Sequence, residues 1–150
     1  MSRLLSSAPT FLVADVAATA DWWNRNLGFT PSFFPEQPPY VYASLQRDGV
    51  EILLLRQEGY RKTQIERPGG VWDAYIRIDG LRDLYEEVRQ KIPLKSDLVK
   101  RPYGDTEFEV EDPNGYVLVF GELTDCVQQK PRPGKSAWTG HPLVSSLTSH

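Results

Sequence analysis

The chain has 150 residues with a formal net charge of −3, a length that fits one domain with its own hydrophobic core. The acidic balance, with a pI near 5.4 and no basic stripe, argues against nucleic acid as the main partner. The single cysteine, Cys126, excludes an internal disulfide and fits a reducing compartment, as a free thiol without chemistry.

The N-terminal segment does not predict secretion. Residues 1–8 carry one arginine and no apolar run long enough for a signal peptide, and no later stretch approaches a membrane span. We therefore expect a cytoplasmic protein with no membrane partner.

The first half of the chain predicts a strand, a helix and then three strands. Residues 9–13 alternate as a strand, Asp15 caps a helix, and Gly28 ends that helix. The apolar stripe of the helix is Val16, Ala20, Trp23 and Leu27. Segment 29–34 follows, and then a hairpin of residues 40–46 and 50–55 that turns at Arg47-Asp48-Gly49. The polar run 56–70 is a long connection, either a binding lid or a mobile loop.

The same pattern begins again at residue 71. Residues 71–78 alternate as a strand, and Asp79-Gly80 starts a helix with the stripe Leu81, Leu84, Tyr85, Val88 and Ile92. Residues 94–99 lead to a closing hairpin in which Asp112-Pro113-Asn114-Gly115 supplies the turn and residues 116–120 form a continuously apolar strand.

The two halves are an internal repeat. Phe11, Val13, Val16 and Trp23 correspond to Ile76, Ile78, Leu81 and Val88 at one offset, and Gly49, Ile52 and Leu54 correspond to Gly115, Leu118 and Phe120 at an offset longer by one residue. The sequence therefore predicts a domain of residues 1–122 with modules at about 8–56 and 71–122. Residues 123–150 form a Pro-, Lys- and Ser-rich extension that is flexible or wraps a neighbour, with Trp138 and Leu143 as anchors.

A repeated strand-helix-three-strand unit that ends in DPNGYVLVF resembles the vicinal oxygen chelate superfamily of glyoxalase I, extradiol dioxygenases, and fosfomycin- and bleomycin-resistance proteins. The resemblance covers residues 8–122 and is most specific in FLVADVAATADWWNRNLGF and PYGDTEFEVEDPNGYVLVFGEL. It implies an α+β fold in which two βαβββ modules form a curved mixed sheet cup with helices on the outer face. Two chains often pair, and Pro9 is a candidate hinge for exchange of the first strand.

The resemblance also places the positions at which enzymes of this family hold a divalent metal. These positions map to Ala8, Leu53, Asp73 and Val119, and only Asp73 offers a ligand atom. The only histidines, His141 and His150, lie in the extension. We therefore expect no metal, no other cofactor and no metal-dependent catalysis, as in the metal-free bleomycin-resistance branch. Glu122 lies at an odd step from Val119 and should face the helix side.

Strand alternation predicts which side chains face the cup. Ala74, Ile76 and Ile78 face the helix, so the residues between them face inward. Arg77 and Asp73 share that inward face and either pair with each other or anchor a charged ligand. Glu107 and Glu109 are expected at a solvated charged edge. The predicted ligand-binding residues are Phe34, Tyr42, Leu53, Trp72, Asp73, Tyr75, Arg77, Tyr103 and Val119.

Three functions fit this cup. The first is a homodimeric, non-catalytic protein that sequesters a drug or metabolite in a dimeric cleft. The second is a metal-independent lyase or isomerase in which Tyr75, Arg77 or a glutamate acts as acid or base. The third is a regulatory module that senses a metabolite. The sequence pairs no nucleophile with a base, which favours the first function and predicts no catalytic residue.

Overall fold

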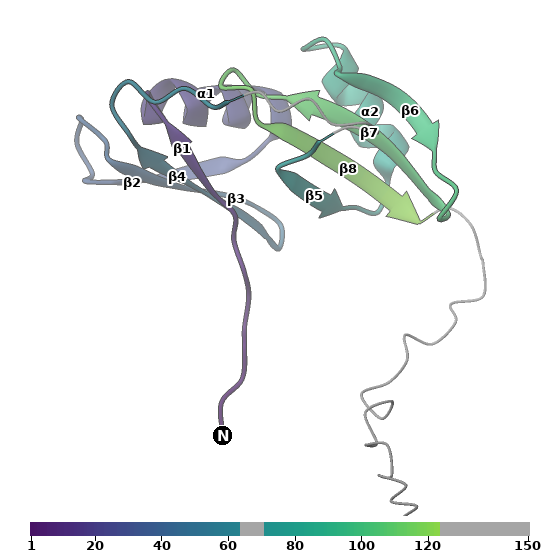
Figure 1. The fold of residues 1–150 in the computed structure, drawn as a ribbon, viewed down its shortest axis with the longest axis horizontal. Helices are drawn as coiled ribbons and strands as arrows, with labels where there is room; N and C mark the ends of the chain where they lie inside the picture. The colour runs from purple at the N-terminus through teal and green to yellow at the C-terminus, as the bar shows by residue number, and fades with distance from the viewer. Residues whose placement is uncertain (64–70, 124–150) are drawn as a thin grey trace, which may run out of the picture.

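A computed structural model describes residues 1–63 and 71–123. The first module contains one helix and four strands, with bounds β1 Thr10–Val13, α1 Val16–Leu27, β2 Thr30–Phe34, β3 Tyr42–Arg47 and β4 Val50–Arg56. The second has the same order, with bounds β5 Ala74–Arg77, α2 Leu81–Arg89, β6 Ser96–Lys100, β7 Asp105–Glu111 and β8 Val117–Leu123. The α+β fold of two βαβββ modules is therefore confirmed (Figure 1).

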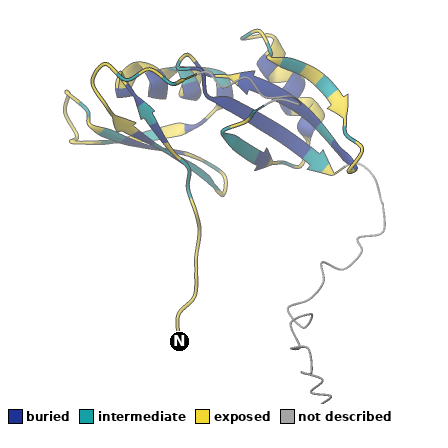
Figure 2. Ribbon diagram, viewed as in Figure 1, coloured by how far each residue is buried: buried dark blue, intermediate teal, exposed yellow. Residues whose placement is uncertain are grey.

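Each module builds its own mixed sheet. The strand orders are β1-β4-β3-β2 and β5-β8-β7-β6, and in both sheets the first strand pairs in parallel with the last. The helix α1 lies against β2, β3 and β4, whereas α2 lies against β8. Residues 1–8 extend away from the body of the molecule and are exposed apart from half-buried Ala8 (Figures 1 and 2).

The registers confirm the internal repeat. Phe11 pairs with Leu54 in the first sheet, and their repeat equivalents Ile76 and Phe120 pair in the second. The one-residue change in offset falls in the hairpin turns. Val50 pairs with Arg47, whereas the equivalent Tyr116 pairs with Asp112 across a turn one residue longer.

The predicted signals at the ends of α1 are confirmed. The Oδ1 of Asp15 accepts a hydrogen bond from the Ala18 amide at 3.0 Å, which satisfies one of the free N–H groups of the first turn. Gly28 has a φ of 71°, a left-handed conformation that glycine adopts without a Cβ clash. The helix therefore presents its apolar stripe to the core, and Val16, Ala20, Trp23 and Leu27 are all buried.

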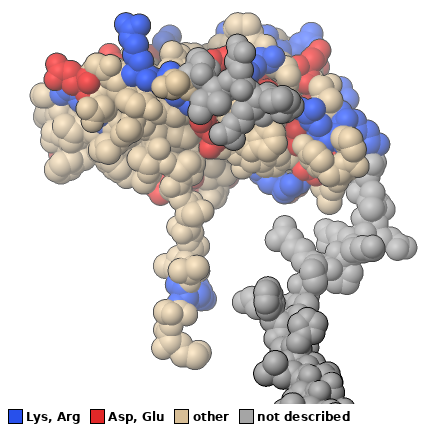
Figure 3. Space-filling model, viewed as in Figure 1, with Lys and Arg blue, Asp and Glu red and all other residues tan. Residues whose placement is uncertain are grey.

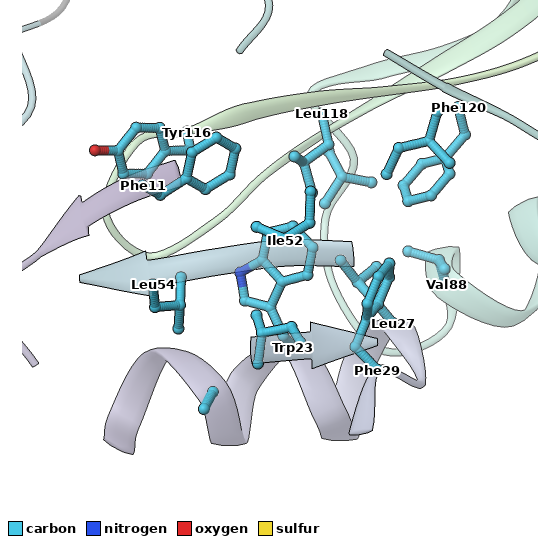
Figure 4. Close-up of a cluster of buried hydrophobic side chains, with 14 of the residues drawn as sticks. Phe11, Trp23, Leu27, Phe29, Ile52, Leu54, Val88, Tyr116, Leu118 and Phe120 are labelled. Atoms are coloured by element: carbon cyan, nitrogen blue, oxygen red, sulfur yellow. The ribbon is translucent and has the colours of Figure 1, made fainter. Parts of the chain in front are cut away.

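One continuous core joins the two modules. Figure 4 shows Trp23 at its centre, Phe11 and Tyr116 on one side, and Phe120 on the other. The rings of Phe11 and Tyr116 stack with centroids 4.1 Å apart, and the Tyr116 hydroxyl donates to the Leu12 carbonyl at 2.7 Å. These contacts link the start of β8 to β1, so the second module packs against the first.

The turn between β7 and β8 carries a buried carboxylate that also links the modules. The Oδ1 of Asp112 accepts the Asn114 and Tyr116 amides at 2.9 Å each, as the turn sequence predicts. Its Oδ2 accepts the indole N–H of Trp23 at 3.3 Å. Asn114 extends the contact by donating to the Thr19 hydroxyl at 3.0 Å.

Some expectations fall outside what the structure describes. The extension, with Cys126, Trp138, Leu143 and both histidines, lies outside the described residues, as do residues 64–70 of the long connection. The predicted strand 71–78 is shorter than expected, since β5 spans only residues 74–77, although Asp73 and Ile78 each donate one backbone hydrogen bond to β8 at its ends. Within the described ranges 1–63 and 71–123, no helix is long and apolar enough to cross a membrane.

The link between Trp23 and Asp112 can be tested by removing the indole N–H. Trp23→Phe leaves a buried carboxylate oxygen short of a donor and removes ring volume, so the free energy of unfolding should fall by about 1–3 kcal/mol. The neighbouring Trp22→Phe is the matched control, because Trp22 is only half-buried, and urea denaturation measures both. Equal losses in the two variants would show that the hydrogen bond contributes nothing.

Candidate functional site

The second sheet has one face covered by α2 and one that α2 does not cover, here named the open face. Phe108 and Phe120 lie on the covered face and stack with centroids 5.3 Å apart. Because side chains alternate along strands, Tyr75, Val119 and Glu109 share the open face, as do Arg77, Gly121 and Glu107. The inward placement predicted for Tyr75 and Arg77 is therefore confirmed.

Asp105 organises one end of the open face. Its Oδ2 accepts the Tyr75 hydroxyl at 2.5 Å and lies 2.8 Å from the Nη2 of Arg77, and its Oδ1 accepts the Arg77 Nη1 at 3.0 Å. This is a two-point pairing of guanidinium and carboxylate. The carboxylate is buried, whereas the Arg77 side chain is 59% exposed, so Asp105 fixes a cation that still faces solvent.

Glu107 is a second buried carboxylate, with a side chain only 1% exposed. Its Oε1 accepts the Tyr103 hydroxyl and lies 3.0 Å from the Tyr75 hydroxyl oxygen, whose single proton it shares with Asp105, and its Oε2 accepts the Arg101 Nε at 3.0 Å. Arg101 also lies 3.7 Å from Glu109. Two buried acids thus hold two tyrosines and two arginines in one network, in which Tyr103 is 59% exposed.

The prediction that Glu107 and Glu109 lie at a solvated charged edge is wrong. Both are buried, because Tyr103 and Arg101 fold over them and supply the hydrogen bonds that replace water. The alternative in which Arg77 pairs with Asp73 is also wrong. Asp73 accepts the Val117 amide at 2.8 Å and lies 3.4 Å from the Lys62 amine, while Arg77 binds Asp105.

The network fixes the protonation of its members. The Arg77 guanidinium holds the pKa of Asp105 below its usual value. Burial, followed by the hydrogen bonds to carboxylates, raises the pKa of Tyr103 to about 12 and raises that of Tyr75 further. Asp105 therefore stays ionised and both hydroxyls stay protonated through the neutral range.

Sequence reasoning missed Arg101 and Asp105. The signal was present in the alternation of Tyr103, Asp105, Glu107 and Glu109 at steps of two, opposite the apolar Phe108. What the sequence lacked was the identity of the partners, because Tyr75 lies about thirty residues away from both Asp105 and Glu107. Figure 3 shows acidic and basic side chains interspersed at the end of the molecule where β6 and β7 lie.

The remaining predicted ligand residues fall in two places. Trp72 and Val119 lie beside Tyr75, since the rings of Trp72 and Tyr75 meet edge to face at 6.2 Å and Val119 pairs with Tyr75. Phe34, Tyr42 and Leu53 belong to the first sheet instead, where Phe34 pairs with Tyr42 and Leu53 pairs with Ser44. The nine residues therefore divide between the two modules.

The positions implied for a metal hold few ligand atoms. Leu53 and Val119 are apolar, and the carboxylate of Asp73 is engaged by Val117 and Lys62. Among residues 1–63 and 71–123 no three His, Cys, Asp or Glu side chains cluster so as to hold a metal ion. Glu122 faces the start of α2 as predicted, and its carboxylate accepts the Gly80 amide at 2.7 Å.

With the geometry in place, comparison with known proteins identifies the family. Residues 7–120 match the Glyoxalase/Bleomycin resistance protein/Dioxygenase superfamily. The chain belongs to this superfamily. No curated protein matches the sequence.

Solved structures share the fold at low identity. The bleomycin-binding protein of bleomycin-producing Streptomyces verticillus, complexed with copper(II)-bleomycin, is 21% identical with a TM-score of 0.60, over 80% of this chain and 97% of that one. A glyoxalase-related enzyme from Clostridium phytofermentans is 16% identical, with a TM-score of 0.65 over 81% and 97%. TioX from Micromonospora sp. ML1 is 18% identical, with a TM-score of 0.61 over 79% and 99%.

Gly121 tests the position of Tyr75. A Cβ at this residue would lie 2.0 Å from the Tyr75 hydroxyl and 2.6 Å from its Cζ, so Gly121→Ala must displace the ring from both carboxylates. We expect a loss of about 1–3 kcal/mol in urea denaturation, because two buried acids lose a donor. In Tyr75→Ala the added methyl should cost much less. Additive effects of the two substitutions would contradict this arrangement.

Acid titration tests the pairing of Asp105 with Arg77. Because folding lowers the pKa of Asp105, its stabilisation is present above the unfolded value of about 3.9 and is lost as pH falls through the folded value. Asp105→Asn should therefore unfold more easily at pH 7, by about 1–3 kcal/mol, and lose less stability than the wild type between pH 4 and pH 2. Parallel stability curves for the two proteins would contradict the pairing.

Proposed function

We propose that the chain is a non-catalytic protein that binds a small planar molecule on the open face of the second sheet. The observation that carries this proposal is the pair of buried acids, Asp105 and Glu107, which hold the exposed Arg77 and Tyr103 in place. Side chains fixed before binding lose little conformational entropy when a ligand arrives. The network therefore favours recognition.

The chemical character of the ligand follows from the exposed groups. Tyr103 and Trp72 offer aromatic surface for stacking, with 59% and 45% of their surface exposed. The Arg77 guanidinium lies 5.3 Å from the Tyr75 ring centroid and presents a planar cation at the same face. A flat drug or metabolite with acceptor groups at its edge complements these side chains.

Proton states support binding over acid-base chemistry. A general acid or base works best when its pKa lies near the working pH. Tyr75 and Tyr103 have raised pKa values and Asp105 a lowered one, so none of the three exchanges a proton readily near pH 7. This favours sequestration over a metal-independent lyase or isomerase.

The cleft is proposed to be completed by a second copy of the chain. Phe34 and Leu55, on strands of the first sheet, are 65% and 43% exposed and lie on one face of it, so they form an apolar patch and are not isolated side chains. Tyr42 pairs with both residues and Leu53 lies nearby on β4. In a homodimer this surface would close over the open face of the partner.

A metal-independent isomerase is the second candidate, and one contact favours it. The Tyr75 hydroxyl donates to the Asp105 carboxylate at 2.5 Å, so a phenol and a carboxylate of the kind used in acid-base catalysis lie in direct contact. One structural neighbour is a glyoxalase-related enzyme. If a screen of small carbonyl compounds finds one that the chain converts, and Tyr75→Phe abolishes that turnover, this candidate replaces the binding function.

Binding can be tested with a thermal-shift panel of planar aromatic metabolites and a bleomycin-type glycopeptide, followed by calorimetry on any compound that raises the Tm. Tyr103→Ala and Arg77→Ala should each weaken such a compound by about tenfold or more, since each removes a stacking or charged contact. Arg82→Ala, an exposed substitution on α2, is the control.

Unchanged affinity in both Tyr103→Ala and Arg77→Ala would contradict the proposed site. Sedimentation in the same buffer reports the oligomeric state. A monomer that binds with full affinity would contradict the dimeric cleft but not the open-face site.

A further inference from the structure

A cavity lies where the helix side of the second module meets the hairpin turn of the first module. Its volume is about 440 Å³, within the range of small-molecule sites. Its apolar wall comes from both modules and contains Phe29, Val50, Ile76, Ile78, Leu84 and Phe120. Ile76 and Phe120 belong to the core, so this cavity is separate from the open face that carries Tyr75.

The internal repeat explains why the cavity exists. The molecule has two equivalent junctions between one module's hairpin turn and the opposite module. In the first junction Tyr116 stacks on Phe11 and Trp23 reaches Asp112. In the second, the repeat equivalents of Tyr116 and Phe11 are Val50 and Ile76, which line the cavity. The equivalent of Trp23 is Val88.

Three aromatic side chains are therefore replaced by aliphatic ones on one side of the molecule only. Rings fill space that the smaller side chains leave empty, and empty space in a core costs stability. The filled junction gives the shape of the missing group. It is a flat ring stacked between the hairpin turn and the first strand of the opposite module.

The charge at the second junction is reversed. The equivalent of Asp112 is Arg47, since each pairs with the first residue beyond its turn. In the filled junction a carboxylate accepts the indole N–H of Trp23. At the cavity a guanidinium stands in its place. It therefore complements an aromatic molecule that carries an acceptor or a negative charge.

The guanidinium of Arg47 is fixed in a position from which it can bind such a group. Its Nη1 donates to the Leu27 carbonyl at 2.7 Å, which fixes the guanidinium beside the end of α1. The nearest carboxylate oxygen, on Asp48, is 3.9 Å from Nε, and that side chain is 92% exposed. The other charges at the rim are Arg77, which is paired with Asp105, and Asp79.

We propose that this cavity binds an aromatic carboxylate, with its ring between Val50 and Ile76 and its carboxylate on Arg47. The ligand would fill the second junction as Tyr116 and Trp23 fill the first. This site shares Arg77 at its rim with the open face, so its test relies on Arg47 and Val50, which the open face does not contain.

The test uses 2-naphthoate, with the neutral 2-naphthamide and the cationic 2-naphthylmethylamine as matched probes, titrated into the full chain and followed by amide NMR. A dozen heavy atoms support a Kd in the millimolar range or tighter. Naphthoate should bind at least about fivefold tighter than the amide, since its carboxylate is opposite in charge to the Arg47 guanidinium and can form two parallel hydrogen bonds with it, whereas the amide carbonyl is a single neutral acceptor. The shifted amides should include Gly49, Val50, Ile76 and Ile78.

Two variants locate the site. Val50→Tyr installs the side chain found at the equivalent position 116, so it should fill the cavity and weaken naphthoate at least tenfold. Val41→Tyr, an exposed substitution, is the matched control and should bind as wild type. Arg47→Met should abolish the preference for naphthoate over the amide, and this comparison within one protein holds even if Val50→Tyr does not fold.

Saturable binding with these shifts and both variant effects supports the proposal. It is overturned if the cationic probe binds best, because Asp79 would then select the ligand. It is also overturned if none of the three probes saturates at millimolar concentration, if the shifts map to the open face, or if folded Val50→Tyr binds as wild type.

Discussion

The structure depends on the contact between the indole of Trp23 and the buried carboxylate of Asp112. Burial raises the pKa of Asp112, and its hydrogen bonds to Asn114, Tyr116 and Trp23 oppose that effect. Four donors thus converge on one carboxylate inside the core, because Asn114 contributes both its backbone and its side-chain N–H groups. Because these donors come from α1 of one module and the closing turn of the other, the contact fixes how the two modules meet.

That junction decides what the rest of the molecule can do. It turns the helix-facing sides of both sheets into one core, in which Leu27, Leu54 and Phe120 are buried together. The faces that the helices do not cover lie outside this core. On the second sheet they carry a network of two acids, two arginines and two tyrosines that satisfies its own charges.

Duplication with divergence gives the chain two different junctions between its modules. The repeat copies the backbone, so hydrogen-bond registers agree in both sheets, but it does not copy the side chains. One junction has Phe11 and Tyr116 and is filled, whereas the other has Ile76 and Val50 and leaves a cavity. Side-chain volume at equivalent positions of the repeat therefore separates a structural contact from a candidate binding site.

The sequence by itself determined the elements, the repeat and the family, because capping residues, turn residues and apolar periodicity are local signals. Asp15, Gly28 and the turn at Asp112 each behave as their chemistry predicts. Alternation also placed Tyr75 and Arg77 on the face opposite the helix. Only the tertiary structure decided their partners, since Asp105 and Glu107 come from a strand about thirty residues further along. It also overturned the solvated edge predicted for Glu107, because a carboxylate is buried only when distant donors replace its water.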